Sequence, residues 1–191
     1  MSINYNRKRT LVVKKWRRIN SKYGYSHPFF KVREDHVILP SGLEINDYTI
    51  WESGDVAQVV PVRSDGTLLL VQQYKHGLGE VIEEFPGGFI DKEETPLEAA
   101  KRELSEETGF SSKKIEKIGT FIHHPTKEVG KLHLFIAYDI EALPSSLEQD
   151  ITEDITIVYY SSEELLAKIK DDTVMQTGSM LGLMLYLQGK K

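Results

Sequence analysis

The chain has 191 residues, a formal net charge of −5 and no cysteine. That length suits one domain of ordinary size, with room for a small appendage. The acidic balance argues against a general nucleic-acid binder, and the lack of cysteine excludes disulfides, thiolate metal sites and a cysteine nucleophile.

Residues 1–20 are basic but lack the apolar run of a signal peptide, and no stretch reaches the roughly 18 apolar residues of a membrane span. We therefore expect a soluble, cytoplasmic protein with no membrane or nucleic-acid partner. Residues 10–16 favour a strand that runs into a basic cluster, which comprises Lys14, Lys15, Arg17 and Arg18. Such a cluster is usually a solvated edge, and contact with phosphate is the alternative.

Residues 23–51 contain short apolar runs separated by turn signals. This pattern predicts an antiparallel β meander. Strands this short bury little surface alone, so the meander should pack on the rest of the chain or on a second copy. Phe29, Phe30 and Trp51 could stack on a base, although packing in a core or an interface is the favoured use of such side chains.

A second unit begins at about Asp55, which predicts a meander domain at residues 1–54 and a main domain at residues 55–191. Apolar strands at 56–62 and 67–74, joined by a turn, predict a hairpin. A strand at 80–85 then leads into Pro86-Gly87-Gly88, which we expect to be a loop. The paired glycines allow backbone there to approach a ligand closely.

Residues 96–108 are predicted to form a helix with both ends marked. Thr95 and Glu98 form a capping-box pattern around Pro96, and Gly109 supplies the left-handed position that ends many helices. At about 100° per residue, one stripe of this helix is apolar. The neighbouring stripe collects Glu103, Glu106 and Glu107.

Carboxylates at this spacing repel one another in a free helix, so a positive group should offset them. Carboxylate oxygens are the ligands that hard Mg²⁺ and Mn²⁺ prefer. The helix therefore carries a candidate metal site at Glu103, Glu106 and Glu107. A solvated acidic face is the alternative.

Two further strands, at 115–123 and 131–140, are predicted to flank a loop that holds Pro125 and Glu128. The nearby histidines His123, His124 and His133 match no strong zinc spacing. A last strand is expected at 155–160, then an N-cap at Ser162 and helices at 163–170 and 173–187. The final helix is apolar over much of its surface and should cover the sheet.

The stretch from Gly88 to Phe110, GFIDKEETPLEAAKRELSEETGF, resembles the Nudix box at every defined position. The resemblance implies an α+β Nudix fold, with a mixed β-sheet sandwiched between helices. It also implies that the protein is a hydrolase that cleaves a nucleoside diphosphate linked to another group, using a divalent metal ion.

The same resemblance implies roles for individual residues. Glu103, Glu106 and Glu107 would bind metal, with the Gly87 carbonyl as a further oxygen. Arg102 would orient the glutamates, and Glu94 would join the metal shell or brace the loop. Candidates for the general base are Glu106, Glu107 and Glu128, and we favour Glu128.

Within the family, the chain is similar to the ADP-ribose pyrophosphatase group in its N-terminal meander, its Glu84-Phe85-Pro86-Gly87-Gly88 sequence and Pro125 beyond the box. This similarity implies a homodimer formed through the N-terminal strands and a Mg²⁺ cofactor, with Mn²⁺ possible. The implied substrate-binding residues are Phe29, Trp51, Lys75, Glu84 and Pro125. The chain departs from the group at Lys75, where arginine is common, at Gly87, where alanine is frequent, and near Ser53, where an arginine is missing.

The favoured function is metal-dependent hydrolysis of the pyrophosphate bond of ADP-ribose, giving AMP and ribose 5-phosphate. The first alternative is hydrolysis of another nucleoside diphosphate sugar, a dinucleoside polyphosphate or a nucleoside triphosphate on the same box. The second is a non-catalytic module that binds a nucleotide sugar. The presence of every box glutamate argues against that module.

Overall fold

The computed structural model describes residues 13–144, 154–171, 173 and 175–189. The chain divides into two compact units, one of Met1–Ser53 with Lys127–Val129 and the other of Gly54–Thr126 with Gly130–Lys191. Among the described residues, no helix is long and apolar enough to cross a membrane.

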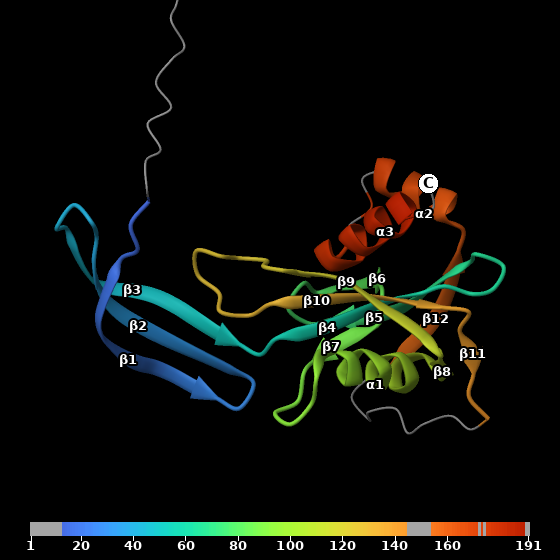
Figure 1. The fold of residues 1–191 in the computed structure, drawn as a ribbon, viewed down its shortest axis with the longest axis horizontal. Helices are drawn as coiled ribbons and strands as arrows, with labels where there is room; N and C mark the ends of the chain where they lie inside the picture. Colours follow the sequence, from blue (N-terminus) through green and yellow to red (C-terminus); the bar gives the residue numbers. More distant parts are fainter. Residues whose placement is uncertain (1–12, 145–153, 172, 174, 190–191) are drawn as a thin grey trace, which may run out of the picture. The chain divides into compact units, whose positions relative to one another are not determined.

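The first unit is an antiparallel meander in the order β1-β2-β3, formed by β1 (Arg17–His27), β2 (Phe30–Ile38) and β3 (Glu44–Ser53) (Figure 1). The predicted meander is confirmed. The strand expected at 10–16 is wrong where it can be checked: residues 10–12 lie outside the described residues, and 13–16 are irregular, so β1 begins only at Arg17. Lys14, Lys15 and Arg18 are exposed, as a solvated edge requires.

The second unit contains a mixed sheet in the order β7-β4-β10-β9, in which β4 and β10 are parallel and the other pairs antiparallel. Its strands are β4 (Val56–Pro61), β7 (Gly87–Phe89), β9 (Lys114–Phe121) and β10 (Leu132–Tyr138). A second sheet, β12-β5-β6, is formed by β5 (Leu68–Lys75), β6 (Glu80–Glu84) and β12 (Ile155–Tyr160). Two short strands that we did not predict, β8 (Phe110–Ser111) and β11 (Glu141–Ala142), pair with each other.

The predicted hairpin at 56–74 is wrong as a continuous ladder. Its turn forms, with Gly66 at φ 83, but β4 and β5 share only the bridge between Val62 and Leu68 before they enter different sheets. The reason is that β10 and β7 already occupy the two edges of β4. The expected loop at the paired glycines is likewise a short strand, β7, because it pairs with β4.

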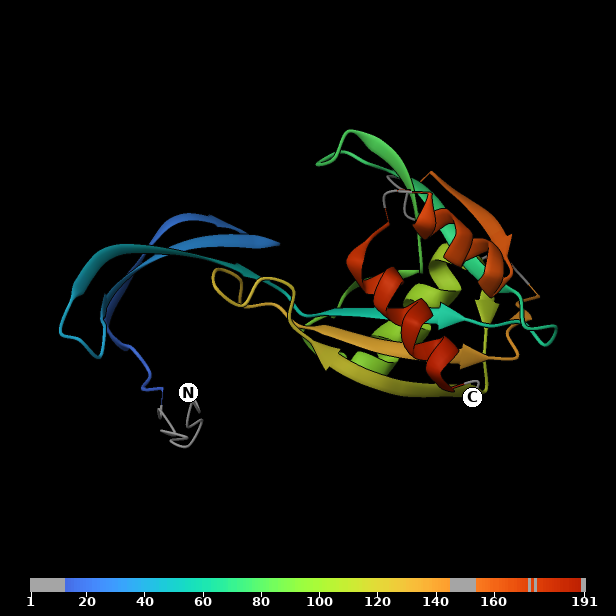
Figure 2. The ribbon, with the colours of Figure 1, turned by 90° about the horizontal axis from the view of Figure 1, so that it is seen from above.

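Helices cover both faces of the mixed sheet, which confirms the predicted sandwich (Figure 1 and Figure 2). They are α1 (Pro96–Thr108), α2 (Ser162–Lys170) and α3 (Thr177–Gly189). Successive residues of β4 point to opposite faces, so Val59 packs in the core under α1 and Val60 in the core under α2 and α3. A Cβ on Gly182 of α3 would lie 2.7 Å from Val60 Cγ2, so glycine permits this close approach.

Two helix starts differ from the expectation. The N-cap of α2 is Ser161 rather than Ser162, and its hydroxyl accepts a hydrogen bond from the Glu164 amide while Glu164 accepts one from the Ser161 amide. The last helix begins at Thr177 rather than at Thr173. Gln176 supplies a polar group there, because its Oε1 accepts a hydrogen bond from the Ser179 amide (2.7 Å).

Candidate active site

The helix that carries the box carboxylates has the ends expected from the sequence. The Thr95 hydroxyl accepts from the Glu98 amide, and the Glu98 carboxylate accepts from the Thr95 amide, which completes the capping box. Gly109 closes the helix at φ 70, and its amide donates to the Ser105 carbonyl. Because both ends are fixed locally, α1 presents its carboxylates on a defined face.

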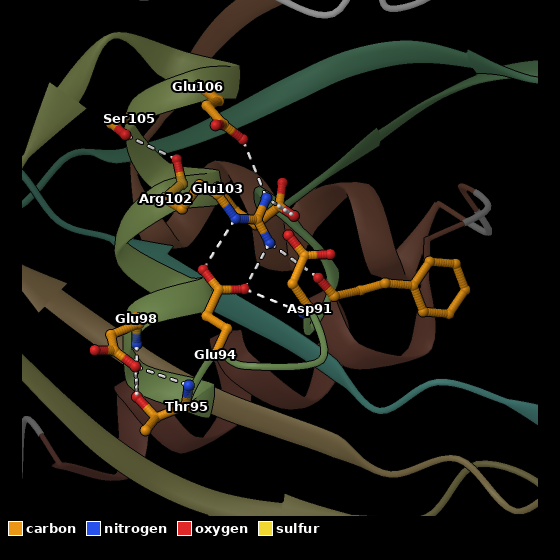
Figure 3. A network of polar contacts seen from close by, with 9 residues as sticks. Asp91, Glu94, Thr95, Glu98, Arg102, Glu103, Ser105 and Glu106 are labelled. Atoms are coloured by element: carbon orange, nitrogen blue, oxygen red, sulfur yellow. Dashed lines mark hydrogen bonds and ion pairs between the residues drawn. The ribbon is translucent and has the colours of Figure 1, made fainter. Parts of the chain in front are cut away.

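Arg102 lies at the centre of these carboxylates (Figure 3). Its Nε and Nη2 donate to the two oxygens of Glu94, each at 3.0 Å, and Nη2 also donates to the Phe89 carbonyl at 2.9 Å. Its Nη1 donates to Glu103 Oε1 at 2.7 Å and to Glu106 Oε2 at 3.1 Å. This guanidinium is the positive group that the clustered glutamates require.

The charges of this cluster stabilise one another. Hydrogen bonds from Arg102 lower the pKa of Glu94 against the opposing effect of burial. The pKa of Arg102 is raised, chiefly by its hydrogen bonds to Glu94, with further contributions from Glu103 and Glu106. Glu94 therefore braces Arg102 and the loop, because its Oε2 also accepts from the Asp91 amide at 3.2 Å.

Two of the carboxylates lie against the paired glycines. Glu103 and Glu107 are 9% and 4% exposed, and the Gly87 amide donates to Glu107 Oε2 at 2.8 Å. A Cβ on Gly88 would lie 2.2 Å from Glu103 Oε1, so only glycine leaves space for this carboxylate. A Cβ on Gly87 would lie 2.5 Å from the Ala57 carbonyl oxygen, which explains why glycine stands here rather than alanine.

The donor set suits a hard divalent cation. It consists of three carboxylates on one helix face, and the absence of a side chain at Gly88 lets the Glu103 carboxylate lie against the backbone of β7. Within the described part of the chain, however, no group of three His, Asp or Glu side chains is already arranged to hold a metal ion. The Arg102 guanidinium forms ion pairs with one oxygen of Glu103 and one oxygen of Glu106, so these carboxylates face the guanidinium. His133 pairs instead with Asp55 Oδ2 at 3.1 Å.

Two of the predicted substrate-binding residues meet in the second unit. Lys75 on β5 lies 2.6 Å from Glu84 Oε1 on β6, and its Nζ also donates to Gln73 Oε1 at 2.6 Å. Glu84 is 9% exposed, and this lysine is its ion-pair partner. Pro125 lies exposed in the loop after β9.

The other candidates belong to the first unit. Phe29 is 70% exposed beside the His27 ring, whereas Trp51 is half-buried in β3. The Trp51 amide donates to the Lys127 carbonyl at 2.9 Å, which places Glu128 alongside β3. The Ser53 hydroxyl donates to Glu128 Oε1 at 2.8 Å. No local sequence pattern predicts this contact, because 75 residues separate the two side chains.

Comparisons with known proteins bear on the family of the chain. The Nudix domain family matches residues 53–177, and the family of nucleoside diphosphate sugar hydrolase N-terminal domains matches residues 16–51. The ADP-ribose pyrophosphatase of Bacillus subtilis (strain 168) is 31% identical over 157 residues, which cover 82% of this chain and 84% of that protein. The methanol dehydrogenase activator of Bacillus methanolicus is 27% identical over 170 residues, covering 89% and 91% of the two chains.

The fold has a solved counterpart. The crystal structure of an ADP compounds hydrolase superposes with a TM-score of 0.80 at 23% sequence identity, over 93% of this chain and 97% of the other. The Nudix domain match covers well over half of the chain and includes α1 with all of its box glutamates. The chain therefore belongs to the Nudix hydrolase family.

Proposed function

We propose that the protein hydrolyses the pyrophosphate bond of a nucleoside diphosphate sugar, and that ADP-ribose is its preferred substrate, giving AMP and ribose 5-phosphate. The observation that carries this proposal is the combination, in one chain, of an ordered carboxylate face on α1 with an N-terminal segment of the nucleoside diphosphate sugar hydrolase type. The Bacillus subtilis relative, which is named an ADP-ribose pyrophosphatase, supports the choice of substrate.

Nudix hydrolases use a divalent metal ion, and the residues here suit one. Glu103, Glu106, Glu107 and the Gly87 carbonyl would hold it, with Mg²⁺ as the expected ion and Mn²⁺ as a substitute. When bound, such an ion neutralises phosphate charge and lowers the pKa of an attacking water.

The chain's own residues have separate tasks in this proposal. Arg102 keeps Glu103 and Glu106 in place through its hydrogen bonds to both. A carboxylate must take the proton of the attacking water, and we assign this role to Glu128, with Glu106 and Glu107 as alternatives. The hydrogen bond from the Ser53 hydroxyl to Glu128 Oε1, at 2.8 Å, orients this carboxylate.

Substrate recognition is assigned to charged and aromatic side chains. Lys75 offers a point charge to phosphate, and its ion pair with Glu84 holds it in place. Phe29 and Trp51 offer ring faces on which an adenine could stack, and Pro125 adds an apolar contact.

Turnover of a substrate panel tests the function. The panel contains ADP-ribose, ADP-glucose, GDP-mannose, a dinucleoside polyphosphate and a nucleoside triphosphate, each with Mg²⁺, with product release as the measurement. We expect kcat/KM for ADP-ribose to exceed the others at least about tenfold, a difference of about 1.4 kcal/mol in transition-state binding. Preference for another compound would remove the ADP-ribose assignment, and turnover of none would indicate a binding module.

We further propose that residues 1–54 form a subdomain for dimerisation and substrate binding, so that the active protein is a homodimer. Aromatic side chains of this unit remain open to solvent, including Tyr23 and Tyr25 at 55% and 54% exposure. Exposed apolar groups of this density are typical of association surfaces. Sedimentation equilibrium should give twice the chain mass of 21.8 kDa, and a monomer with full activity would contradict the proposal.

A further inference from the structure

We propose that Gln58 and Ser179 are positioning residues for the segment Phe85–Gly88, which connects the two sheets and carries the candidate ligand carbonyl of Gly87. The inference rests on the proposed function for its consequence in catalysis. Its evidence is a buried hydrogen-bond network of the second unit.

The backbone of Phe85 is held by side chains rather than by a strand. β6 ends at Glu84 and β7 begins at Gly87, so Phe85 and Pro86 belong to neither sheet. Phe85 is 1% exposed, and its buried polar groups need partners. Gln58 Nε2 donates to the Phe85 carbonyl at 2.9 Å, and the Phe85 amide donates to Ser179 Oγ at 2.8 Å.

The following residues connect this anchor to the carboxylates of α1. The Pro86 carbonyl accepts from the Val59 amide at 3.0 Å, and the Gly87 amide donates to Glu107 Oε2 at 2.8 Å. Gly87 is the register partner of Gln58, and a Cβ on Gly87 would touch β4. The segment therefore packs closely against the backbone of β4. Its position determines where the Gly87 carbonyl lies relative to Glu107.

Gln58 and Ser179 also contact each other. Gln58 Nε2 lies 3.2 Å from Ser179 Oγ and 3.3 Å from Gln176 Oε1. Gln58 is 3% exposed and Ser179 is 0% exposed. Among the described residues, Gln58 Oε1 is a buried side-chain oxygen without a hydrogen-bond partner. A buried amide with an unpaired oxygen costs stability that an apolar side chain of the same size would not. The amide nitrogen offsets part of this cost by giving the buried Phe85 carbonyl its hydrogen bond, so glutamine at this position holds the Phe85 backbone in place.

The test uses Ser179→Ala and Gln58→Met, which remove the acceptor of the Phe85 amide and the donor to its carbonyl. Two properties are measured without substrate: the Kd for Mn²⁺ by titration calorimetry, and hydrogen exchange of the Gly87 and Gly88 amides in the cation-free protein. We expect each variant to raise the Kd about tenfold and to accelerate this exchange by at least tenfold. The double variant should weaken binding by less than the product of the two single effects, because both act on one peptide segment.

Leu165→Val is the matched control, because Leu165 is buried in the same core cluster as Phe85 but belongs to α2. It should lower the thermal midpoint while leaving the Mn²⁺ affinity unchanged. A Kd within twofold of wild type in both Ser179→Ala and Gln58→Met, with a lowered midpoint, would overturn the proposal and leave a purely structural pair. Neither measurement involves turnover. If the wild-type protein turned over no compound of the substrate panel while the variants still bound Mn²⁺ more weakly, the proposed function would be contradicted but this inference would stand.

Discussion

Replacing Glu107 with glutamine is expected to lower kcat by about 10³-fold while the fold remains intact. The carboxylate is 4% exposed and accepts a hydrogen bond from the Gly87 amide. The amide oxygen of glutamine can still accept that bond, so the segment at Gly87 keeps its place. The negative charge is lost, which weakens binding of a hard cation and removes the ability to take a proton.

Glu98→Gln is the control for this substitution. Glu98 lies on the same helix and the change in charge is the same, but its carboxylate only caps the helix, a role that glutamine also fills. Steady-state kinetics with Mg²⁺ and calorimetric Mn²⁺ binding should both be impaired in Glu107→Gln and should both resemble wild type in Glu98→Gln. Wild-type turnover by Glu107→Gln would contradict the role of this residue.

Replacing Arg102 with lysine is expected to reduce the free energy of unfolding by about 2–3 kcal/mol and kcat by about 10²-fold. One guanidinium donates to Glu94, Glu103 and Glu106, as Figure 3 shows. It also donates to the Phe89 carbonyl. An ammonium keeps the charge but lacks the planar fork and has only three donors, so it cannot hold three carboxylates and a carbonyl together. Glu103, which is 9% exposed, would then lose a close partner.

The stability difference should depend on pH in a defined direction. Hydrogen bonding to Arg102 places the pKa of Glu94 in the folded protein below its ordinary value of 4.5. The resulting stabilisation is fully present above pH 4.5 and is lost as pH falls through the lower pKa of the folded state. The difference in the free energy of unfolding between wild type and Arg102→Lys should therefore be constant near neutrality and shrink below about pH 4.5.

Urea unfolding at a series of pH values measures this gap. The reciprocal substitution Lys101→Arg is the control, because Lys101 is exposed on the same helix and should change stability by less than about 0.5 kcal/mol. A gap that stays constant down to pH 3 would show that the interaction with Glu94 contributes little.

The sequence predicted the bounds of α1 to the residue. Its start depends on Thr95 and Glu98, its end on Gly109, and its acidic face on a period of 3.6 residues. All of these signals act within about one turn of helix, so they can be read without knowledge of the rest of the fold. The spacing called only for some positive group beside these carboxylates, and it was the resemblance to the Nudix box that implied a role for Arg102 in orienting them.

Only the tertiary structure decided how the strands are shared between sheets. The residues at 56–74 have the pattern of a hairpin, yet β4 and β5 separate because β7 and β10 pair with both edges of β4. The contacts Ser53–Glu128 and Gln58–Ser179 span 75 and 121 residues. Pairing between distant segments depends on which strand edges and buried polar groups remain unsatisfied, a property of the assembled fold rather than of any local stretch.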